Sequence, residues 1–201
     1  GLYVYACTNT DILYNNINIR GGATSSGDVF YTSGGGGLNL NNNIFTNFGG
    51  GYCMYVLNGT TFTSDYNDLY TKGSIFGVNY ASYINSFAAW QSNLSKDFNS
   101  KSIDPYYFSM SDLHAYAPGL IGTGTSISTI KDDIDGEARN TPKPCIGADE
   151  FPYVFRDATF TSLISPLTPC PYVANDVIVK LKNYAQAPIK TIKINNILPI
   201  S

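Results

Sequence analysis

The chain has 201 residues, of which 13% are charged, and its formal net charge is −3. This balance argues against a nucleic-acid partner, which would need a clustered basic face. No apolar run approaches the roughly 18 residues that a membrane-spanning helix requires, so none is predicted. The hydrophobic fraction of 43% is enough to form a core, and aromatic residues are abundant, with 16 Tyr and 11 Phe.

Residues 1–80 contain a strand-and-turn unit that occurs three times. Each copy is marked by an asparagine with an apolar side chain two residues later, and the three pairs are Asn15 with Ile17, Asn42 with Ile44, and Asn67 with Leu69. A second block of strand residues precedes each marker, at 2–6, 28–32 and 52–56. Self-similarity at a period of roughly 25 residues is typical of a repeat architecture.

The composition of the repeat indicates strands rather than helices. It is rich in Tyr, Ile, Val, Phe and Thr, interrupted by Gly and Asn. Such a unit fits one coil of a parallel β-solenoid, whose strands pair about 4.8 Å apart between coils. Asparagine tolerates left-handed backbone angles, and its amide can bond the next coil. We therefore predict a structural ladder of Asn15, Asn42 and Asn67; the alternative is asparagine as turn filler.

Three segments carry a family resemblance: NNINI at 15–19, NNNIF at 41–45 and SDYNDLY at 64–70. They resemble the last coils of bacterial right-handed parallel β-helix proteins, which have the pectin-lyase-like fold. Later motifs are similar to the closing segment of such proteins from Bacteroidetes-type bacteria: AAWQ at 88–91, DFNS at 97–100, DIDG at 133–136 and IGADEF at 146–151. The resemblance implies an all-β, right-handed parallel β-helix of about 3–4 coils with a cap that contains a short helix.

Residues 82–94 are the best helix candidate. Ser82 can cap the N-terminus, and Tyr83, Phe87 and Trp90 fall on one helical face. The resemblance implies that this helix packs at the end of the solenoid. Trp90, the only tryptophan, would suit a sugar platform if exposed, but we favour a core anchor.

Residues 95–152 hold an acidic cluster: Asp132, Asp133, Asp135, Asp149 and Glu150. Carboxylates suit Ca²⁺, but the spacing is not that of an EF-hand. We therefore expect these carboxylates to cap turns and to pair with Arg139. The alternative is that the cluster binds Ca²⁺. His114 is the only histidine, and the resemblance places 112–114 in a structural strand. We predict no catalytic residue, no metal ligand and no cofactor.

The four cysteines show no zinc-binding spacing. Cys7 and Cys53 lie two coils apart, about 9–10 Å, which exceeds the ~7 Å limit for a disulfide. We expect both to be free and at least partly buried. Whether Cys145 pairs with Cys170 stays open at this point.

The composition changes at Pro152, so we divide the chain into 1–152 and 153–201. Alternating apolar and polar residues at 176–182 and 189–194 predict antiparallel strands. This segment resembles the first half of an Ig-like module. A whole Ig-like sandwich needs about 100 residues, so the segment is either truncated or folds back on the solenoid.

These features favour a non-catalytic secreted or bacterial cell-surface protein that serves in adhesion, glycan binding or as a structural stalk. The expected partner is a polysaccharide or cell-surface glycan, and we expect an export signal and further domains of the same protein outside this chain. The alternative is a polysaccharide lyase or hydrolase whose active site lies in coils before Gly1, because a fold does not fix a function. A phage tail-spike fragment is a third alternative.

Overall fold

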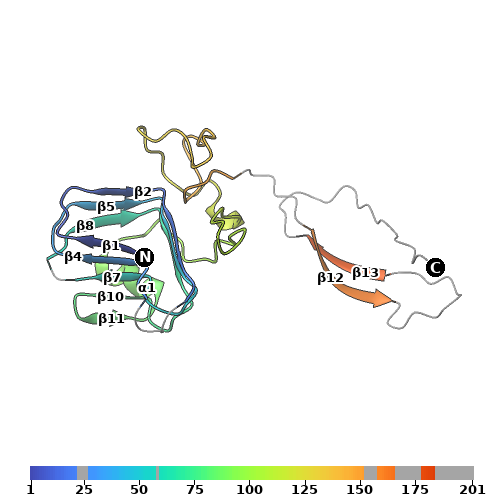
Figure 1. The fold of residues 1–201 in the computed structure, drawn as a ribbon, viewed down its shortest axis with the longest axis horizontal. Helices are drawn as coiled ribbons and strands as arrows, with labels where there is room; N and C mark the ends of the chain where they lie inside the picture. Colours follow the sequence, from blue (N-terminus) through green and yellow to red (C-terminus); the bar gives the residue numbers. More distant parts are fainter. Residues whose placement is uncertain (22–26, 58, 152–157, 166–177, 184–201) are drawn as a thin grey trace, which may run out of the picture. The chain divides into compact units, whose positions relative to one another are not determined.

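The structure is a computed structural model that describes residues 1–21, 27–57, 59–151, 158–165 and 178–183. The chain divides into two compact units, Gly1–Phe151 and Pro152–Ser201. The first unit is a mostly β structure, a parallel β-solenoid of about three turns (Figure 1). This architecture is consistent with the parallel β-helix expected from the repeat.

Three sheets form the walls of the solenoid. The first contains β1 (Leu2–Tyr5), β4 (Phe30–Ser33), β7 (Met54–Val56) and β10 (Gly77–Asn79). The second contains β2 (Asp11–Leu13), β5 (Leu38–Asn41) and β8 (Phe62–Asp65). The third contains β3 (Asn16–Ile19), β6 (Ile44–Asn47) and β9 (Asp68–Thr71). All pairings among these strands are parallel, so each full coil contributes one strand to each wall.

The third wall shows that the expected repeat register is one residue wrong in the middle coil. Ile17 pairs with Phe45, and Phe45 pairs with Leu69. Ile44, the expected partner, pairs instead with Asn16 and Asp68. Neighbouring residues of a strand point to opposite faces, so this shift decides which side chain enters the core.

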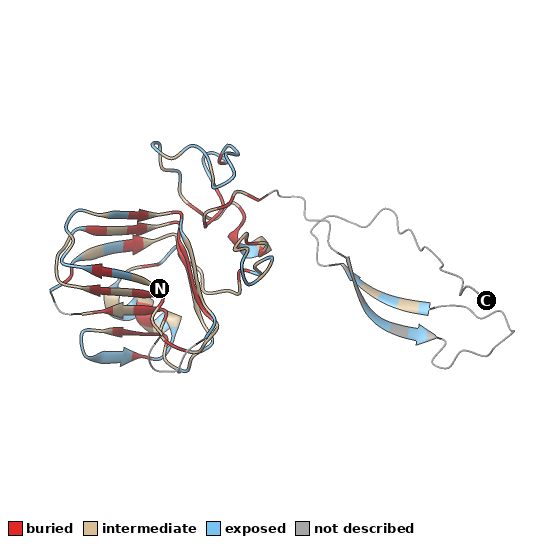
Figure 2. Ribbon diagram, viewed as in Figure 1, coloured by how far each residue is buried: buried red, intermediate tan, exposed pale blue. Residues whose placement is uncertain are grey.

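The interior of the solenoid is a largely apolar core. Phe30, Leu40, Phe45, Met54 and Leu69 are each 0% exposed and belong to one cluster. Figure 2 shows buried residues on the strands of all coils. Burying a side chain of this size contributes about 1.5–3 kcal/mol, so the stacked inward rows are the main source of stability.

The solenoid closes after β10. The chain reverses into β11 (Ser82–Ile84), which pairs antiparallel with β10. Helix α1 (Phe87–Leu94) follows, with Ser86 accepting a 3.2 Å hydrogen bond from the Ala89 nitrogen. The expected helix over 82–94 with a Ser82 cap is therefore too long, because its first residues satisfy their backbone groups in the sheet.

Trp90 is the core residue of this end. It is 0% exposed, and its ring centroid lies 5.7 Å from that of Phe76. Trp90 is thus a core anchor, whereas Tyr83, expected on the same helical face, lies in β11 and is 64% exposed.

Residues 95–151 form a cap of loops with a short 3-10 helix at Pro118–Leu120. The cap packs on the outward face of the third wall, where Ile44 joins a second apolar cluster with Leu120, Ile146 and Phe151. Residues 112–114 have no strand structure, contrary to the expectation from the resemblance. Outward-facing residues of β6 are therefore buried as well as inward-facing ones.

The second unit contains one described antiparallel pair, β12 (Ala158–Ser165) with β13 (Ile178–Asn183). The strand expected at 189–194 lies outside the described residues. In the described part of the chain, no helix combines the length and apolar character needed to cross a membrane. Cys7, Cys53 and Cys145 are free thiols, and Cys170 lies outside the described residues.

Candidate functional site

The asparagine ladder runs through Asn15, Asn43 and Asn67, so the expected Asn42 is replaced by its neighbour. The Asn43 Oδ1 accepts 3.0 Å hydrogen bonds from the backbone and side-chain nitrogens of Asn15. The backbone nitrogen and Nδ2 of Asn43 in turn donate to the Asn67 Oδ1, at 2.8 and 3.0 Å. Asn43 and Asn67 are buried and Asn15 is exposed, and the amides bond successive coils to one another, which makes the ladder a structural device rather than a binding site.

Asn42 has a different role, which explains why the ladder passes through Asn43 instead. Tyr14, Asn42 and Tyr66 precede the ladder residues and have left-handed φ angles of 54°, 58° and 56°. This conformation turns each coil at its corner. Asn42 also fixes the cap, because its Oδ1 accepts from the Thr125 nitrogen at 2.8 Å and its Nδ2 donates to the Thr125 carbonyl at 2.8 Å.

Tyrosines line the outward face of the first wall. Tyr3, Tyr31 and Tyr55 occupy matching positions of β1, β4 and β7, with ring centroids 4.6 and 5.2 Å apart. Tyr5, Tyr52 and Tyr83 flank this row, with ring contacts of 5.9–6.4 Å. We call these six residues the tyrosine face. The alternation of β1 explains it, since Val4 points into the core between Tyr3 and Tyr5.

The tyrosine face is open to solvent at its edges and half-buried in its middle. Tyr3, Tyr5 and Tyr83 are 63%, 65% and 64% exposed. Partial desolvation, followed by the neighbouring phenols of Tyr3 and Tyr55, raises the pKa of Tyr31 above its ordinary value. The Tyr31 hydroxyl therefore stays protonated at neutral pH and can donate a hydrogen bond.

A polar pocket lies between the cap and the corner of the first coil. Its lining includes Tyr14, Asn16, Asp112, His114 and Asp149, and its volume is about 570 Å³. Asn16 positions two of the cap segments, since its Nδ2 donates to the Leu113 carbonyl at 2.8 Å and its Oδ1 accepts from the Ala148 nitrogen at 3.0 Å. Residues distant in sequence are thereby brought to one place.

His114 is held between two carboxylates in this pocket. Its Nδ1 contacts the Asp112 carboxylate, and its Nε2 lies 2.8 Å from the Asp135 Oδ2. The hydrogen bond with Asp112, then that with Asp135, raises the pKa of His114 to about 9. The same contact with His114 lowers the pKa of Asp112. The pocket therefore strongly favours positive charge at the imidazole.

Asp149 faces the same pocket from a buried position. Asp149 is 8% exposed, and burial raises the pKa of its carboxyl group to about 6. The charge of His114 opposes this rise, while Asp133 and Asp135 reinforce it. Among the described residues, only His114, Asp135 and Asp149 form a His/Cys/Asp/Glu group whose donor atoms all lie within 4.8 Å of one another.

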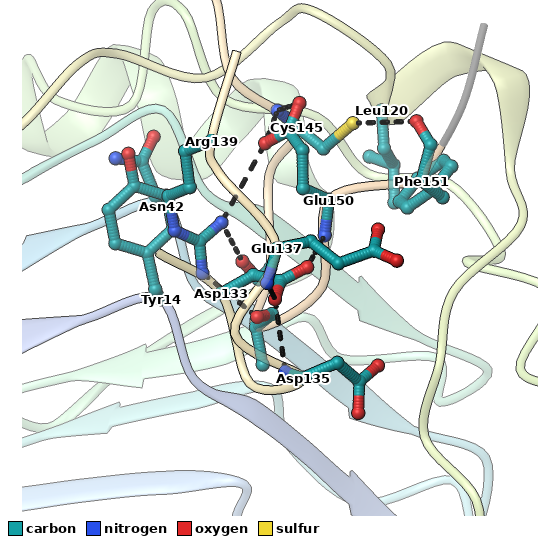
Figure 3. A network of polar contacts seen from close by, with 12 residues as sticks. Tyr14, Asn42, Leu120, Asp133, Asp135, Glu137, Arg139, Cys145, Glu150 and Phe151 are labelled. Atoms are coloured by element: carbon teal, nitrogen blue, oxygen red, sulfur yellow. Dashed lines mark hydrogen bonds and ion pairs between the residues drawn. The ribbon is translucent and has the colours of Figure 1, made fainter. Parts of the chain in front are cut away.

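Asp133 and Glu150, two further acidic residues of the cap, have structural partners (Figure 3). Asp133 accepts backbone hydrogen bonds from Asp135, Glu137 and Glu150 at 2.8–3.0 Å. Partial burial acts to raise the pKa of Asp133, but these donors and Arg139 lower it overall. Asp133 thus caps a turn, as expected for this acidic segment.

Arg139 organises the other half of this network (Figure 3). It donates to the carbonyls of Gly147 and Ala148 at 3.2 and 2.8 Å, and its Nη1 lies 3.8 Å from the Glu150 Oε2. Its guanidinium carbon lies 3.7 Å from the centroid of the Tyr14 ring. Glu150 therefore pairs with Arg139 as expected, whereas Asp135 and Asp149 are grouped with His114.

Comparisons of this chain with protein-family models, with curated proteins and with solved structures found no match. The function must therefore be argued from the two features on the surface of the solenoid unit, the tyrosine face and the histidine pocket.

The sequence carried a signal for each feature but not its geometry. Tyr3, Tyr31 and Tyr55 stand in the three strand blocks, so a correct register would have aligned them. The pocket had only a weak signal, the single histidine two residues after Asp112. Its other members, Asp135 and Asp149, come from later loops whose paths the sequence does not reveal.

Proposed function

We propose that this chain belongs to a non-catalytic secreted or bacterial cell-surface protein of the right-handed parallel β-helix class, and that it binds polysaccharide through the tyrosine face. The second unit would be the beginning of an Ig-like module, for which the antiparallel pairing of β12 and β13 is supporting evidence. In this proposal the solenoid serves as a stiff support for adhesion.

The tyrosine face is the observation that carries the proposal. A tyrosine offers an apolar ring for sugar C–H groups and a hydroxyl for sugar oxygens. The row repeats from coil to coil, at 4.6 and 5.2 Å between rings, so it presents regularly spaced hydroxyls to a linear polymer. Three of the six rings are more than 60% exposed and belong to one contiguous group of ring contacts, and contiguous exposed patches of this kind mark interaction sites.

The proposal is tested by measuring polysaccharide binding with the whole chain on a glycan array, followed by titration of the best ligand. The variants are Tyr3→Ser and Tyr31→Ser, alone and combined. An aromatic contact is worth about 0.5–1.5 kcal/mol, so each change should weaken binding by roughly two- to tenfold. The matched control is Tyr106→Ser, since Tyr106 is 63% exposed but lies on the cap.

Equal binding by the wild type and the Tyr3/Tyr31 double variant would refute the role of the tyrosine face. The same samples should be assayed for release of unsaturated oligosaccharide from polyuronates. Turnover would favour the alternative, a polysaccharide lyase or hydrolase of the pectin-lyase-like fold. Neither binding nor turnover would leave the structural stalk as the description of this unit.

A further inference from the structure

We propose that His114, Asp135 and Asp149 form a binding site for a divalent transition-metal ion such as Zn²⁺, with Asp112 as the residue that orients the imidazole. This site is independent of the tyrosine face and of polysaccharide binding.

The first support is the geometry of the donors. One ring nitrogen of His114 and one carboxylate oxygen each from Asp135 and Asp149 lie within 4.8 Å of one another. Zinc binds histidine nitrogen and carboxylate oxygen at about 2.0–2.2 Å, so the donors would need to shift by about 1 Å. The His114 Nε2 and the Asp135 Oδ2, which lie 2.8 Å apart, would separate slightly to admit the ion. All three ligands lie on cap loops, and the Asp135 side chain is 54% exposed, so such an adjustment is open to them.

The second support is the arrangement of His114. A metal-bound histidine usually gives its other ring nitrogen to a carboxylate, which fixes the tautomer and the ring plane. Asp112 contacts the Nδ1 of His114 in this way and leaves the Nε2 facing Asp135. The two neighbouring residues on one loop therefore provide a ligand and its orienting partner.

The third support is the environment of Asp149. Its residue is 8% exposed and it lines the pocket. The charged groups that act on its carboxylate are two further acids, Asp133 and Asp135, and the imidazole of His114. A buried carboxylate among acids is costly unless a cation or a proton compensates it. A protonated His114 provides part of this compensation, and a metal ion at the centre of the group would provide it when the imidazole is a neutral ligand.

The nitrogen ligand decides the class of ion. Calcium prefers six to eight oxygen ligands, whereas imidazole suits zinc and other transition metals. Three protein ligands leave one position of a tetrahedral ion for water, as in open zinc sites. This position would face the pocket of about 570 Å³.

The experiment is a calorimetric titration of the tag-free whole chain with ZnCl₂ at pH 7.5, since a histidine tag would mask the result. We expect one ion per chain. His114→Gln and Asp149→Asn should weaken binding by at least about 100-fold, and Asp112→Asn by about 10–100-fold, the usual effect of an orienting partner. Asp132→Asn is the matched control, because Asp132 is an exposed acid of the same loop outside the group, and it should change the affinity by less than about twofold.

A second measurement does not depend on any variant. His114 is the only histidine of the chain, so the ¹⁵N signals of its ring are unambiguous, and zinc should shift the Nε2 signal. Zinc binding that leaves this signal unmoved would overturn the proposal, as would the absence of binding at millimolar zinc. Tighter binding of Ca²⁺ than of Zn²⁺, unchanged in His114→Gln, would replace it with an oxygen-only site.

Discussion

The Asn43 Oδ1 accepts hydrogen bonds from both nitrogens of Asn15, each at 3.0 Å, so one amide joins two coils twice. Its Nδ2 adds a 2.7 Å bond to the Ile12 carbonyl and a 3.0 Å bond to Asn67. The middle member of the ladder thus satisfies backbone and side-chain groups on both sides.

Asn43→Ala should lower the free energy of unfolding by about 3 kcal/mol, because several buried partners lose a hydrogen bond at once. Urea unfolding followed by circular dichroism measures the change. Asn93→Ala, at an exposed position of α1, is the control and should stay within about 0.5 kcal/mol. Equal effects of the two substitutions would show that the ladder carries no special stability.

The buried carboxyl group of Asp68 should make the free energy of unfolding depend on pH. It is 0% exposed, its Oδ1 accepts from the Ile103 nitrogen at 3.0 Å and its Oδ2 has no partner in the described structure. Burial raises its pKa from 3.8 to about 8. The folded state therefore holds a proton that the unfolded state loses, and stability falls as pH rises between about 4 and 8.

Asp68→Asn removes this proton linkage, so the variant should lose stability less steeply than the wild type over that range. The wild-type slope attributable to Asp68 is at most about 1.4 kcal/mol per pH unit. The difference between the two proteins should be largest above pH 8 and smallest near pH 4. Parallel stability curves from pH 4 to 9 would contradict the assignment.

Trp90 and Asp97 form a buried polar contact at the closed end of the solenoid. The Trp90 Nε1 donates to the Asp97 Oδ2 at 3.0 Å, and the Asp97 Oδ1 accepts from Ser64 and Ser100 at 2.7 and 2.8 Å. Trp90→Phe keeps an aromatic ring but leaves this carboxylate without one donor, which should cost about 2 kcal/mol. Chemical unfolding followed by circular dichroism tests this, with Phe98→Ala as the control because Phe98 is 67% exposed.

Alanine substitutions at two glycines of the cap distinguish the cost of backbone strain from the cost of side-chain crowding. Gly136 and Gly147 have φ angles of 82° and 109°, so alanine is strained at both. A Cβ on Gly136 would meet nothing within 4 Å, whereas one on Gly147 would lie 2.5 Å from the Ile44 Cδ1. Gly136→Ala should cost about 1–2 kcal/mol, and Gly147→Ala a further 1–3 kcal/mol or so. Equal shifts in thermal melting would show that the cap yields freely at Gly147.

The repeat was visible in the sequence because stacked coils place similar residues at similar positions. Its register was harder to predict, for a physical reason. Asn41, Asn42 and Asn43 are consecutive, so the sequence offers three candidates for the middle ladder residue. The ladder residues are separated by 28 and then 24 positions, so the assumption of nearly equal spacing led to the wrong asparagine. Only the backbone reveals that Asn42 takes the left-handed corner and leaves the amide ladder to Asn43.

The end of the helix was predictable and its start was not. Ser82 and Ser86 are both good capping residues, and local propensity does not separate them. Tertiary structure determines where the helix begins, since residues 82–84 gain sheet hydrogen bonds with β10. The histidine pocket is also tertiary, because Asn16 on β3 joins the loop of Leu113 to that of Ala148.

The reversal at β11 has a consequence for self-association. A parallel solenoid can act as a template on which further strands polymerise in register. At this end, β11 runs against β10, residue Lys101 bonds β9 through the Leu69 nitrogen at 2.9 Å, and the Asp97 nitrogen bonds the Ser64 carbonyl of β8 at 2.9 Å. The second and third walls thus finish in strands that already have partners, and the first finishes in β11, whose reversed direction does not continue the parallel stack. This end of the molecule is therefore a poor seed for fibril growth.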